Sequence, residues 1–148
     1  FMKLAIKEAK KGILEGHGGP FGAVIVKEGK VISKAHNSVV KKNDPTCHGE
    51  MEAIRKATKK LKSFDLSGCE IYTTGYPCPM CFCAILWANI DKVYYGCNTT
   101  DTEIIGFRDK AFEENIPNKK ISICEEIDRK ECLKLYDDYK NKQNKTMY

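Results

Sequence analysis

Apolar side chains recur at helical spacing at the start of the chain, which predicts an amphipathic helix over residues 1–14. The residues of its apolar stripe are Met2, Ala5, Ile6, Ala9 and Ile13. Two short apolar segments follow, at residues 21–26 and 31–37, and both have the length of a strand. Glu28 and Gly29 between them are typical of a tight turn, so we expect a β-hairpin.

Two further helical patterns begin at residues whose side chains could bind a metal or transfer protons. After a turn rich in Asn, Asp and Pro, a second stripe predicts a helix with His48 and Glu50 in its first turn. That stripe consists of Met51, Ile54, Ala57 and Leu61. A strand is predicted at residues 70–74, and the next helix begins at Cys78. Pro79 takes the first helical position, where its missing N–H loses nothing. The apolar face expected for this helix is Cys81, Ala84, Ile85 and Ala88.

The last third of the chain adds two strands and two helical segments. Residues 92–96 read as a strand, and Thr100 with Glu103 resembles a capping box that opens a short helix. Ile121 and Ile123 suggest a fifth strand. The stripe of the final helix is Cys132, Leu135, Tyr136 and Tyr139. This order of elements predicts the α/β class, with a three-layer α/β/α sandwich around a five-stranded mixed sheet.

Length and composition indicate one globular domain over residues 1–148. No segment is apolar over the length of a membrane span and no signal-peptide pattern is present, so we expect a cytoplasmic protein without membrane contact. The net charge is +5, but the lysines are scattered, which favours a solvated surface over a nucleic-acid-binding track. Because Phe1 already lies inside a helical pattern, we expect that native residues precede it.

A distant histidine and two cysteines three apart indicate a metal site. Cys78 and Cys81 at a helix start place both sulfurs on one face, and the positive helix end favours the thiolate. With His48 they supply three ligands of a tetrahedral Zn²⁺ site and leave the fourth position for water, whereas structural zinc usually has four protein ligands. Glu50, two residues past His48, is placed to move that water's protons. The pattern therefore favours catalytic zinc over a structural zinc module.

Most other cysteines and histidines are expected to be structural. Cys47 should be a packed thiol at a helix start, and Cys83 should point away from the metal ligands. His17 lies in a glycine-rich loop and is expected to face solvent, while His36 is expected to be structural. Trp87 has two interpretations, core filler or pocket wall, and the sequence alone favours the core.

The segments 48–50 and 77–81 together resemble the signature of the cytidine deaminase superfamily. Its guanine deaminase branch is the more similar one, since segments 18–26, 43–50 and 106–109 also match it. The resemblance implies a cytidine deaminase-like fold that uses Zn²⁺. Two positions depart from the common family pattern. Gly49 replaces an alanine, and Tyr76 replaces a glutamate and removes a charge beside the zinc.

The resemblance also implies roles for residues outside the metal motif. Asn37 hydrogen-bonds the base, Phe21 and Trp87 help to wall the site, and Asp109 is a second carboxylate at the substrate. It further implies a homodimer in which the C-terminal tail, residues 140–148, is exchanged between subunits. Tyr148 would then close the pocket of the partner.

The implied reaction is zinc-dependent hydrolytic deamination of a free nucleobase, guanine to xanthine and ammonia. Cytosine deaminase is one alternative, because it shares the zinc site and the sequence His-Gly-Glu. A tRNA adenosine deaminase is another and would use the positive charge, but it should show a basic, aromatic-lined RNA track. A non-enzymatic zinc-binding module is the alternative from a different class, and Glu50 argues against it.

Overall fold

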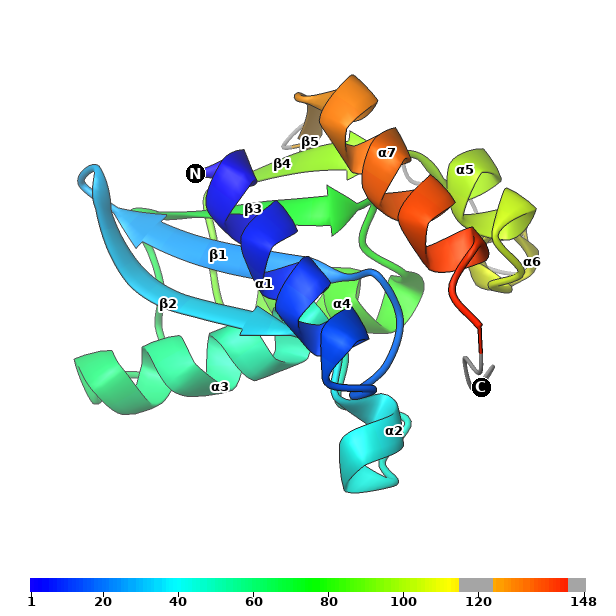
Figure 1. Ribbon diagram of the computed structural model, residues 1–148. Helices are drawn as coiled ribbons and strands as arrows, with labels where there is room; N and C mark the ends of the chain where they lie inside the picture. Colours follow the sequence, from blue (N-terminus) through cyan, green and yellow to red (C-terminus); the bar gives the residue numbers. More distant parts are fainter. Residues whose placement is uncertain (115–123, 144–148) are drawn as a thin grey trace.

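The computed structural model describes residues 1–114 and 124–143 of the chain, and a five-stranded sheet forms its centre (Figure 1). The strands are β1 (Gly22–Lys27), β2 (Lys30–His36), β3 (Cys69–Gly75), β4 (Lys92–Cys97) and β5 (Cys124–Glu126). Their spatial order is β2-β1-β3-β4-β5. β1 is antiparallel to β2 and β3, whereas β3–β4 and β4–β5 are parallel pairs. The predicted mixed sheet is confirmed.

Helices cover both faces of the sheet. They are α1 (Met2–Leu14), α2 (Val39–Lys42), α3 (Gly49–Leu61), α4 (Pro79–Trp87), α5 (Thr99–Ile104), α6 (Asp109–Glu114) and α7 (Arg129–Lys140). α1 and α7 lie over one face, and α3 and α4 over the other, which gives the three layers (Figure 1). Among the described residues, no helix is both long and apolar enough to cross a membrane.

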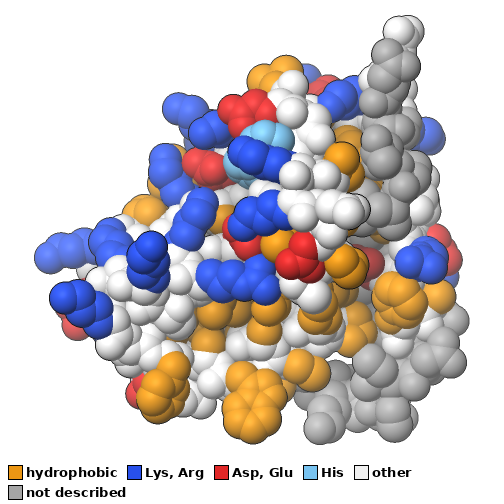
Figure 2. Space-filling view, turned by 90° about the horizontal axis from the view of Figure 1, so that it is seen from below, with side chains coloured by type: hydrophobic (Ala, Val, Ile, Leu, Met, Phe, Trp, Pro, Cys, Tyr) orange, Lys and Arg blue, Asp and Glu red, His pale blue; other side chains and the backbone are white. Residues whose placement is uncertain are grey.

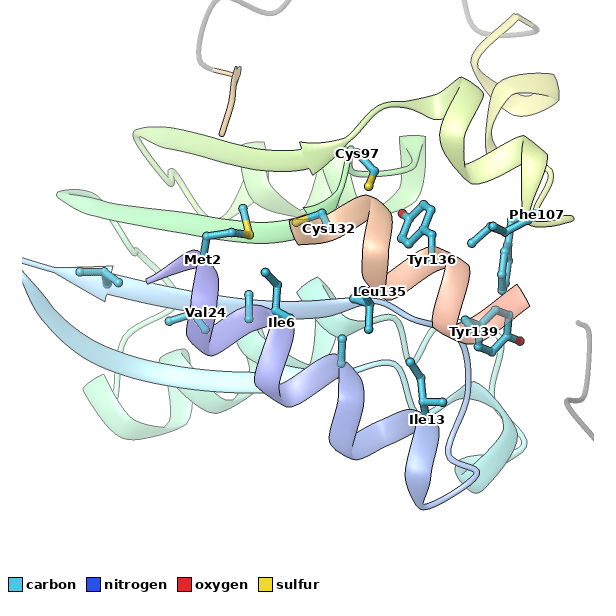
Figure 3. Packing of buried hydrophobic residues seen from close by; sticks show 14 residues of the cluster. Met2, Ile6, Ile13, Val24, Cys97, Phe107, Cys132, Leu135, Tyr136 and Tyr139 are labelled. Atoms are coloured by element: carbon cyan, nitrogen blue, oxygen red, sulfur yellow. The ribbon is translucent and has the colours of Figure 1, made fainter. Parts of the chain in front are cut away.

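The burial pattern of β1 follows from this layering. Val24 and Val26 belong to the hydrophobic cluster under α1 and α7, whereas Ala23 and Ile25 belong to the cluster under α3 and α4. Successive side chains of a strand point to opposite faces, so a strand covered on both sides is apolar throughout. Figure 3 shows the first cluster, in which residues of α1 and α7 meet above the sheet.

The hairpin between β1 and β2 has the predicted tight turn. Lys27 pairs with Lys30, and the two residues between them, Glu28 and Gly29, have φ values of 49° and 70°. Two consecutive residues with positive φ are what a twisted two-residue hairpin requires, and glycine adopts that conformation without steric cost.

Three details differ from the sequence-based expectations. The helix α2 was not predicted. The capping box of α5 is formed by Asn98 and Asp101, not by Thr100 and Glu103. In it, the Asn98 side chain accepts the N–H of Asp101 at 3.0 Å, and the Asp101 carboxylate accepts the N–H of Asn98 at 2.8 Å. The fifth strand lies at Cys124–Glu126, and the predicted positions Ile121 and Ile123 are outside the described residues.

Asp101 also joins α5 to α7. The guanidinium of Arg129 donates to both carboxylate oxygens, with 2.6 Å between Nη2 and Oδ1. A second link is the 3.2 Å contact between the hydroxyl groups of Thr102 and Tyr136. Phe107, just after α5, donates its N–H to the carbonyl of Thr102 at 3.2 Å. These contacts fix the segment that leads into α6.

Candidate active site

The two motif segments each place a metal-ligating side chain at the start of a helix. His48 is the N-cap of α3 and Cys78 is the N-cap of α4, both with extended backbone conformation. Pro79 is the first residue of α4, as predicted, and Cys81 lies in its first turn. The positive ends of two helix dipoles therefore meet at one point, which favours anionic ligands such as thiolates.

The three predicted ligands, His48, Cys78 and Cys81, lie together, with their ligand atoms within 4.8 Å of one another. The distance from Cys78 Sγ to His48 Nδ1 is 3.6 Å. Zinc bonds of about 2.3 Å to sulfur and 2.0–2.1 Å to nitrogen, at the tetrahedral angle, require about 3.6 Å between these atoms. The side chains thus fit a zinc ion as they stand.

The protonation states of these residues also suit a metal. The hydrogen bond from Cys81 lowers the pKa of the Cys78 thiol to about 4, and His48 assists. The pKa of Cys81 is raised instead, because it donates that hydrogen bond and is buried. Burial lowers the pKa of His48, but the contact with Cys78 and the charge of Glu50 raise it above its usual value. Cys78 is therefore already a thiolate at neutral pH.

Glu50 lies in the first turn of α3 and is buried, with 6% of its surface exposed. Burial raises the pKa of its carboxyl to about 7, and the negative charge of Cys78 adds to the shift. A carboxyl group that titrates near neutral pH can accept and return a proton in the same reaction, which is the requirement for a general acid–base group.

A pocket opens directly onto this cluster. The residues that line it are Phe21, Asn37, His48, Glu50, Tyr76, Cys78, Phe107 and Asp109. Six of these were assigned a role at the site from the sequence. Tyr76 was noted there only as a departure from the family pattern beside the zinc, and Phe107 only as part of the segment that contains Asp109.

Asn37 contributes an unsatisfied donor to the pocket. It is fully buried, and its side-chain oxygen accepts the N–H of Val39 at 3.2 Å. Its amide nitrogen Nδ2 has no hydrogen-bond partner among the described residues. A buried donor without a partner destabilises the folded protein by roughly 1–3 kcal/mol. A bound molecule that accepts a hydrogen bond from Nδ2 would remove this penalty, which explains an asparagine at this position.

Aromatic rings form the wall of the pocket. Phe21 and Phe107 meet edge to face with their centroids 4.9 Å apart, and Phe21 also meets Tyr136 at 5.9 Å. A Cβ atom at Gly19 would lie 2.8 Å from both phenylalanine rings, so glycine is needed for this packing. Phe21 thus lies in the pocket lining, and its contact with a substrate stays a prediction.

Trp87 does not occupy the core position that the sequence favoured. Its side chain is 87% exposed at the end of α4, and it is absent from the described lining of the pocket. The buried residues of α4 are Cys81, Phe82 and Ile85, and Trp87 lies on the opposite side of the helix. Tyr148 lies outside the described residues.

The remaining cysteines behave as predicted. Cys47 is buried just before α3 and donates to the Asp44 carboxylate at 3.3 Å, while Cys83 is exposed. His17 differs, since it is only 13% exposed and its Nδ1 lies 2.9 Å from Nε2 of His36. Burial lowers the pKa of His17. Gly16, with a φ of 71°, follows the end of α1, and the N–H of His17 donates to the carbonyl oxygen of Gly12 at 2.9 Å, which holds His17 against the helix end.

Comparisons with known proteins identify the family. Residues 1–97 match the cytidine and deoxycytidylate deaminase zinc-binding region. The guanine deaminase of Bacillus subtilis (strain 168) is 43% identical over 136 residues, which cover 86% of this chain and 87% of the relative. A tRNA-specific adenosine deaminase of Aquifex aeolicus is 50% identical over 95 residues, or 64% of this chain and 62% of the relative.

A solved structure agrees with the sequence relatives. The X-ray structure of guanine deaminase from Bacillus subtilis superimposes with a TM-score of 0.75 at 40% identity, covering 100% of this chain and 96% of the other. The predicted resemblance and the cytidine deaminase-like fold are thereby confirmed. The chain belongs to the cytidine and deoxycytidylate deaminase family, and it is a deaminase of the cytidine deaminase superfamily.

Proposed function

We propose that this protein is a zinc-dependent guanine deaminase that converts guanine and water to xanthine and ammonia. The observation that carries the proposal is the composition of one pocket. It combines His48 and Cys78 with the proton-transfer group Glu50, the second carboxylate Asp109 and the unsatisfied donor of Asn37.

His48, Cys78 and Cys81 would hold the zinc. A zinc ion bound by three protein ligands lowers the pKa of water to about 7 and so supplies a nucleophile at neutral pH. The chain's own contribution is the pair of helix starts that present these ligands and the apolar walls that limit access of bulk water.

Glu50 moves the protons of the reaction. It accepts a proton from the attacking water, delivers it to a ring nitrogen and then helps to protonate the departing amino group. Its carboxyl, with a pKa of about 7, is suited to both directions of transfer. The C2 carbon of guanine gains the water oxygen and loses its amino group as ammonia.

Asp109 supports guanine as the substrate. Guanine presents N1–H and its 2-amino group along one edge, and a single carboxylate can accept from both. Cytosine and adenine have an unprotonated ring nitrogen beside the amino group, which would face the carboxylate without a hydrogen between them. Asn37 Nδ2 complements this arrangement, because purine ring nitrogens and the 6-oxo group accept hydrogen bonds.

We also propose that the protein forms a homodimer. Leu86 and Trp87 at the end of α4 are 46% and 87% exposed, as expected for interface residues seen in a single chain. In the face seen in Figure 2, hydrophobic side chains gather along one edge, below a band of Lys and Arg side chains. Light scattering of the purified protein and of Trp87→Lys tests this, and a monomeric wild type would contradict it.

A tRNA adenosine deaminase is the second candidate, because the Aquifex relative is 50% identical over 95 residues. One experiment separates the candidates. Ammonia release is measured with guanine, cytosine, adenine, their nucleosides and a tRNA anticodon stem-loop, and Glu50→Gln serves as the inactive control. Turnover restricted to guanine supports the proposal. Turnover of the stem-loop without guanine activity contradicts it and supports the tRNA adenosine deaminase.

A further inference from the structure

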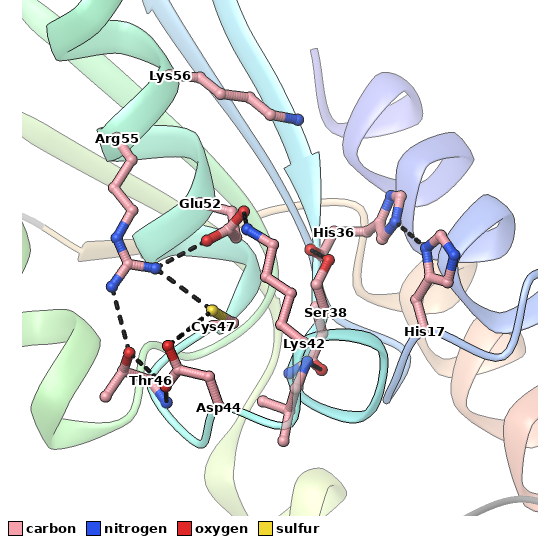
Figure 4. Close-up of polar contacts among 12 residues, drawn as sticks. His17, His36, Ser38, Lys42, Asp44, Thr46, Cys47, Glu52, Arg55 and Lys56 are labelled. Carbon is pink, nitrogen blue, oxygen red and sulfur yellow. Dashed lines mark hydrogen bonds and ion pairs between the residues drawn. The ribbon is translucent and has the colours of Figure 1, made fainter.

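Three potential ligand atoms converge outside the pocket, where the end of α1 meets the end of β2. They belong to Glu15, His17 and His36, and all lie within 4.8 Å of one another. His17 Nδ1 is 2.9 Å from His36 Nε2 and 3.2 Å from the Glu15 carboxylate, and Figure 4 shows the two imidazoles facing each other. We propose that these residues form a second metal site, which takes a divalent ion such as Zn²⁺.

The hydrogen bond between His36 and Glu8 leaves an unprotonated ring nitrogen in this cluster. Nδ1 of His36 lies 3.3 Å from the Glu8 carboxylate, so this nitrogen carries the proton and donates to Glu8. Nε2 of His36 is then an acceptor that faces His17. A carboxylate that holds the far nitrogen of a histidine in this way is typical of metal-binding imidazoles.

His17 Nδ1 thus faces two acceptors, the imidazole of His36 and the carboxylate of Glu15. A single N–H at Nδ1 can satisfy only one of them well. A divalent cation accepts lone pairs from all three groups at once. His17 then carries its proton on Nε2, so the ion binds without a net loss of protons from either ring.

The distances suit a metal with nitrogen and oxygen ligands. With metal–nitrogen bonds of about 2.0–2.1 Å, the observed 2.9 Å between the ring nitrogens corresponds to an angle near 90° at the metal. A tetrahedral angle needs about 3.3 Å, a change of a few tenths of an ångström. Two imidazoles and a carboxylate are a common ligand set for zinc.

The two histidines are held in place by the surrounding chain. A Cβ atom at Gly12 would lie 2.7 Å from the His36 ring, so that ring rests directly on α1. The carbonyl oxygen of His17 accepts the N–H groups of Val40 and Lys41 at 3.0 and 3.1 Å. The site therefore joins two segments of backbone, residues 12–17 and 36–41. Its most exposed ligand is Glu15, at 43%.

The test is a zinc titration of metal-free, tag-free protein against a competing chelator of micromolar affinity. We expect two Zn²⁺ ions per chain for the wild type and one for His17→Ala and for Glu15→Gln. Glu28→Gln, which alters an exposed glutamate in the β1–β2 turn, should still bind two. One ion in the wild type, or two in both site variants, would overturn the proposal.

Cobalt(II) distinguishes the two sites by spectroscopy and does not depend on deaminase activity. The first equivalent should give the strong thiolate-to-metal charge-transfer absorption of the Cys78 and Cys81 site, and the second should add only weak ligand-field bands. These weak bands should be missing in Glu15→Gln. A second equivalent that adds thiolate absorption, or that binds unchanged in Glu15→Gln, would contradict a site made by Glu15, His17 and His36.

Discussion

Asn37 donates its main-chain N–H to the carbonyl oxygen of Phe21 at 2.8 Å, so two residues that line the pocket are fixed to each other through the backbone. The link leaves the Asn37 side chain free to serve two functions. Its oxygen holds the start of α2 through Val39, and its nitrogen faces no partner among the described residues.

Asn37→Asp separates these two functions, because it keeps the acceptor for Val39 and removes the donor. We expect kcat/KM for guanine to fall by about 10-fold or more, the value of one lost hydrogen bond in a buried site. Asn37→Ala should show a similar loss of activity and an additional loss of thermal stability. Steady-state kinetics and thermal unfolding measure the two effects, and an unchanged kcat/KM in Asn37→Asp would remove the residue from substrate binding.

Glu50→Gln should retain zinc and lose activity by roughly 10²–10⁴-fold, because the amide cannot accept or return the proton. Metal analysis and ammonia release are measured on the same preparation. Glu52→Gln is the matched control on the same helix, since Glu52 pairs with Lys42 and Arg55 away from the pocket. Loss of zinc in Glu50→Gln, or normal turnover, would contradict the proposed role.

Asp109→Ala should reduce guanine turnover by about 10²-fold or more without creating efficient cytosine turnover, because a paired contact to the substrate is lost. Asp137→Ala, on the exposed side of α7, controls for the loss of a negative charge. Efficient cytosine deamination by the wild type would show that Asp109 does not select guanine.

The Glu52 ion pair predicts a pH dependence of stability. Burial raises the pKa of Glu52, but hydrogen bonds from Lys42 and Arg55 outweigh it, so its folded pKa lies below the ordinary value. The ionised Glu52 therefore contributes to the free energy of unfolding above its unfolded pKa, about 4.3. This contribution is lost as the pH falls through the lower pKa of the folded protein.

We expect Glu52→Gln to be less stable than the wild type by about 1 kcal/mol at pH 7 and to differ less at acidic pH. Urea unfolding at both pH values measures the free energy of unfolding. An equal difference between the two proteins at both values would mean that Glu52 acts through packing and not through its charge.

Deletion of residues 145–148 tests the exchanged tail that the family resemblance implies. If Tyr148 closes the pocket of a partner subunit, the shortened protein should fold with unchanged thermal stability but deaminate guanine more slowly, because water enters the site. Tyr148→Phe should retain most of the activity, since the ring is kept. An unchanged rate in the shortened protein would exclude a role for the tail in closing the pocket.

The cluster of His48, Cys78 and Cys81 could be predicted from the sequence because its determinants are local. Cys78 and Cys81 share one helical turn, Pro79 marks the helix start, and Glu50 follows His48 by two residues. Each relationship is set by backbone geometry within a few residues. The meeting of the two segments followed from the predicted order of strands and helices.

The position of Trp87 could not be predicted in this way. All residues of α4 are apolar, so periodicity offers no contrast between its buried and exposed sides. Only the packing of Phe82 and Ile85 against the rest of the fold decides which side faces solvent. The contact of His17 with His36 could not be predicted either, because it depends on how α1 packs against His36 at Gly12.

His48 and Cys78 are thirty residues apart, and this separation bears on the folding kinetics. An ion captured by the cysteines alone gains its histidine only after a loop of about 30 residues closes, at an entropic cost on the order of 3 kcal/mol. That loop contains β3, which lies between β1 and β4 in the sheet. The pairing of β3 with β1 joins residues as far apart in the sequence as Ala23 and Thr73, so it is non-local and therefore slow. Completion of the metal centre would then coincide with one of the last steps of sheet assembly, so zinc would dissociate readily from folding intermediates and slowly from the native protein.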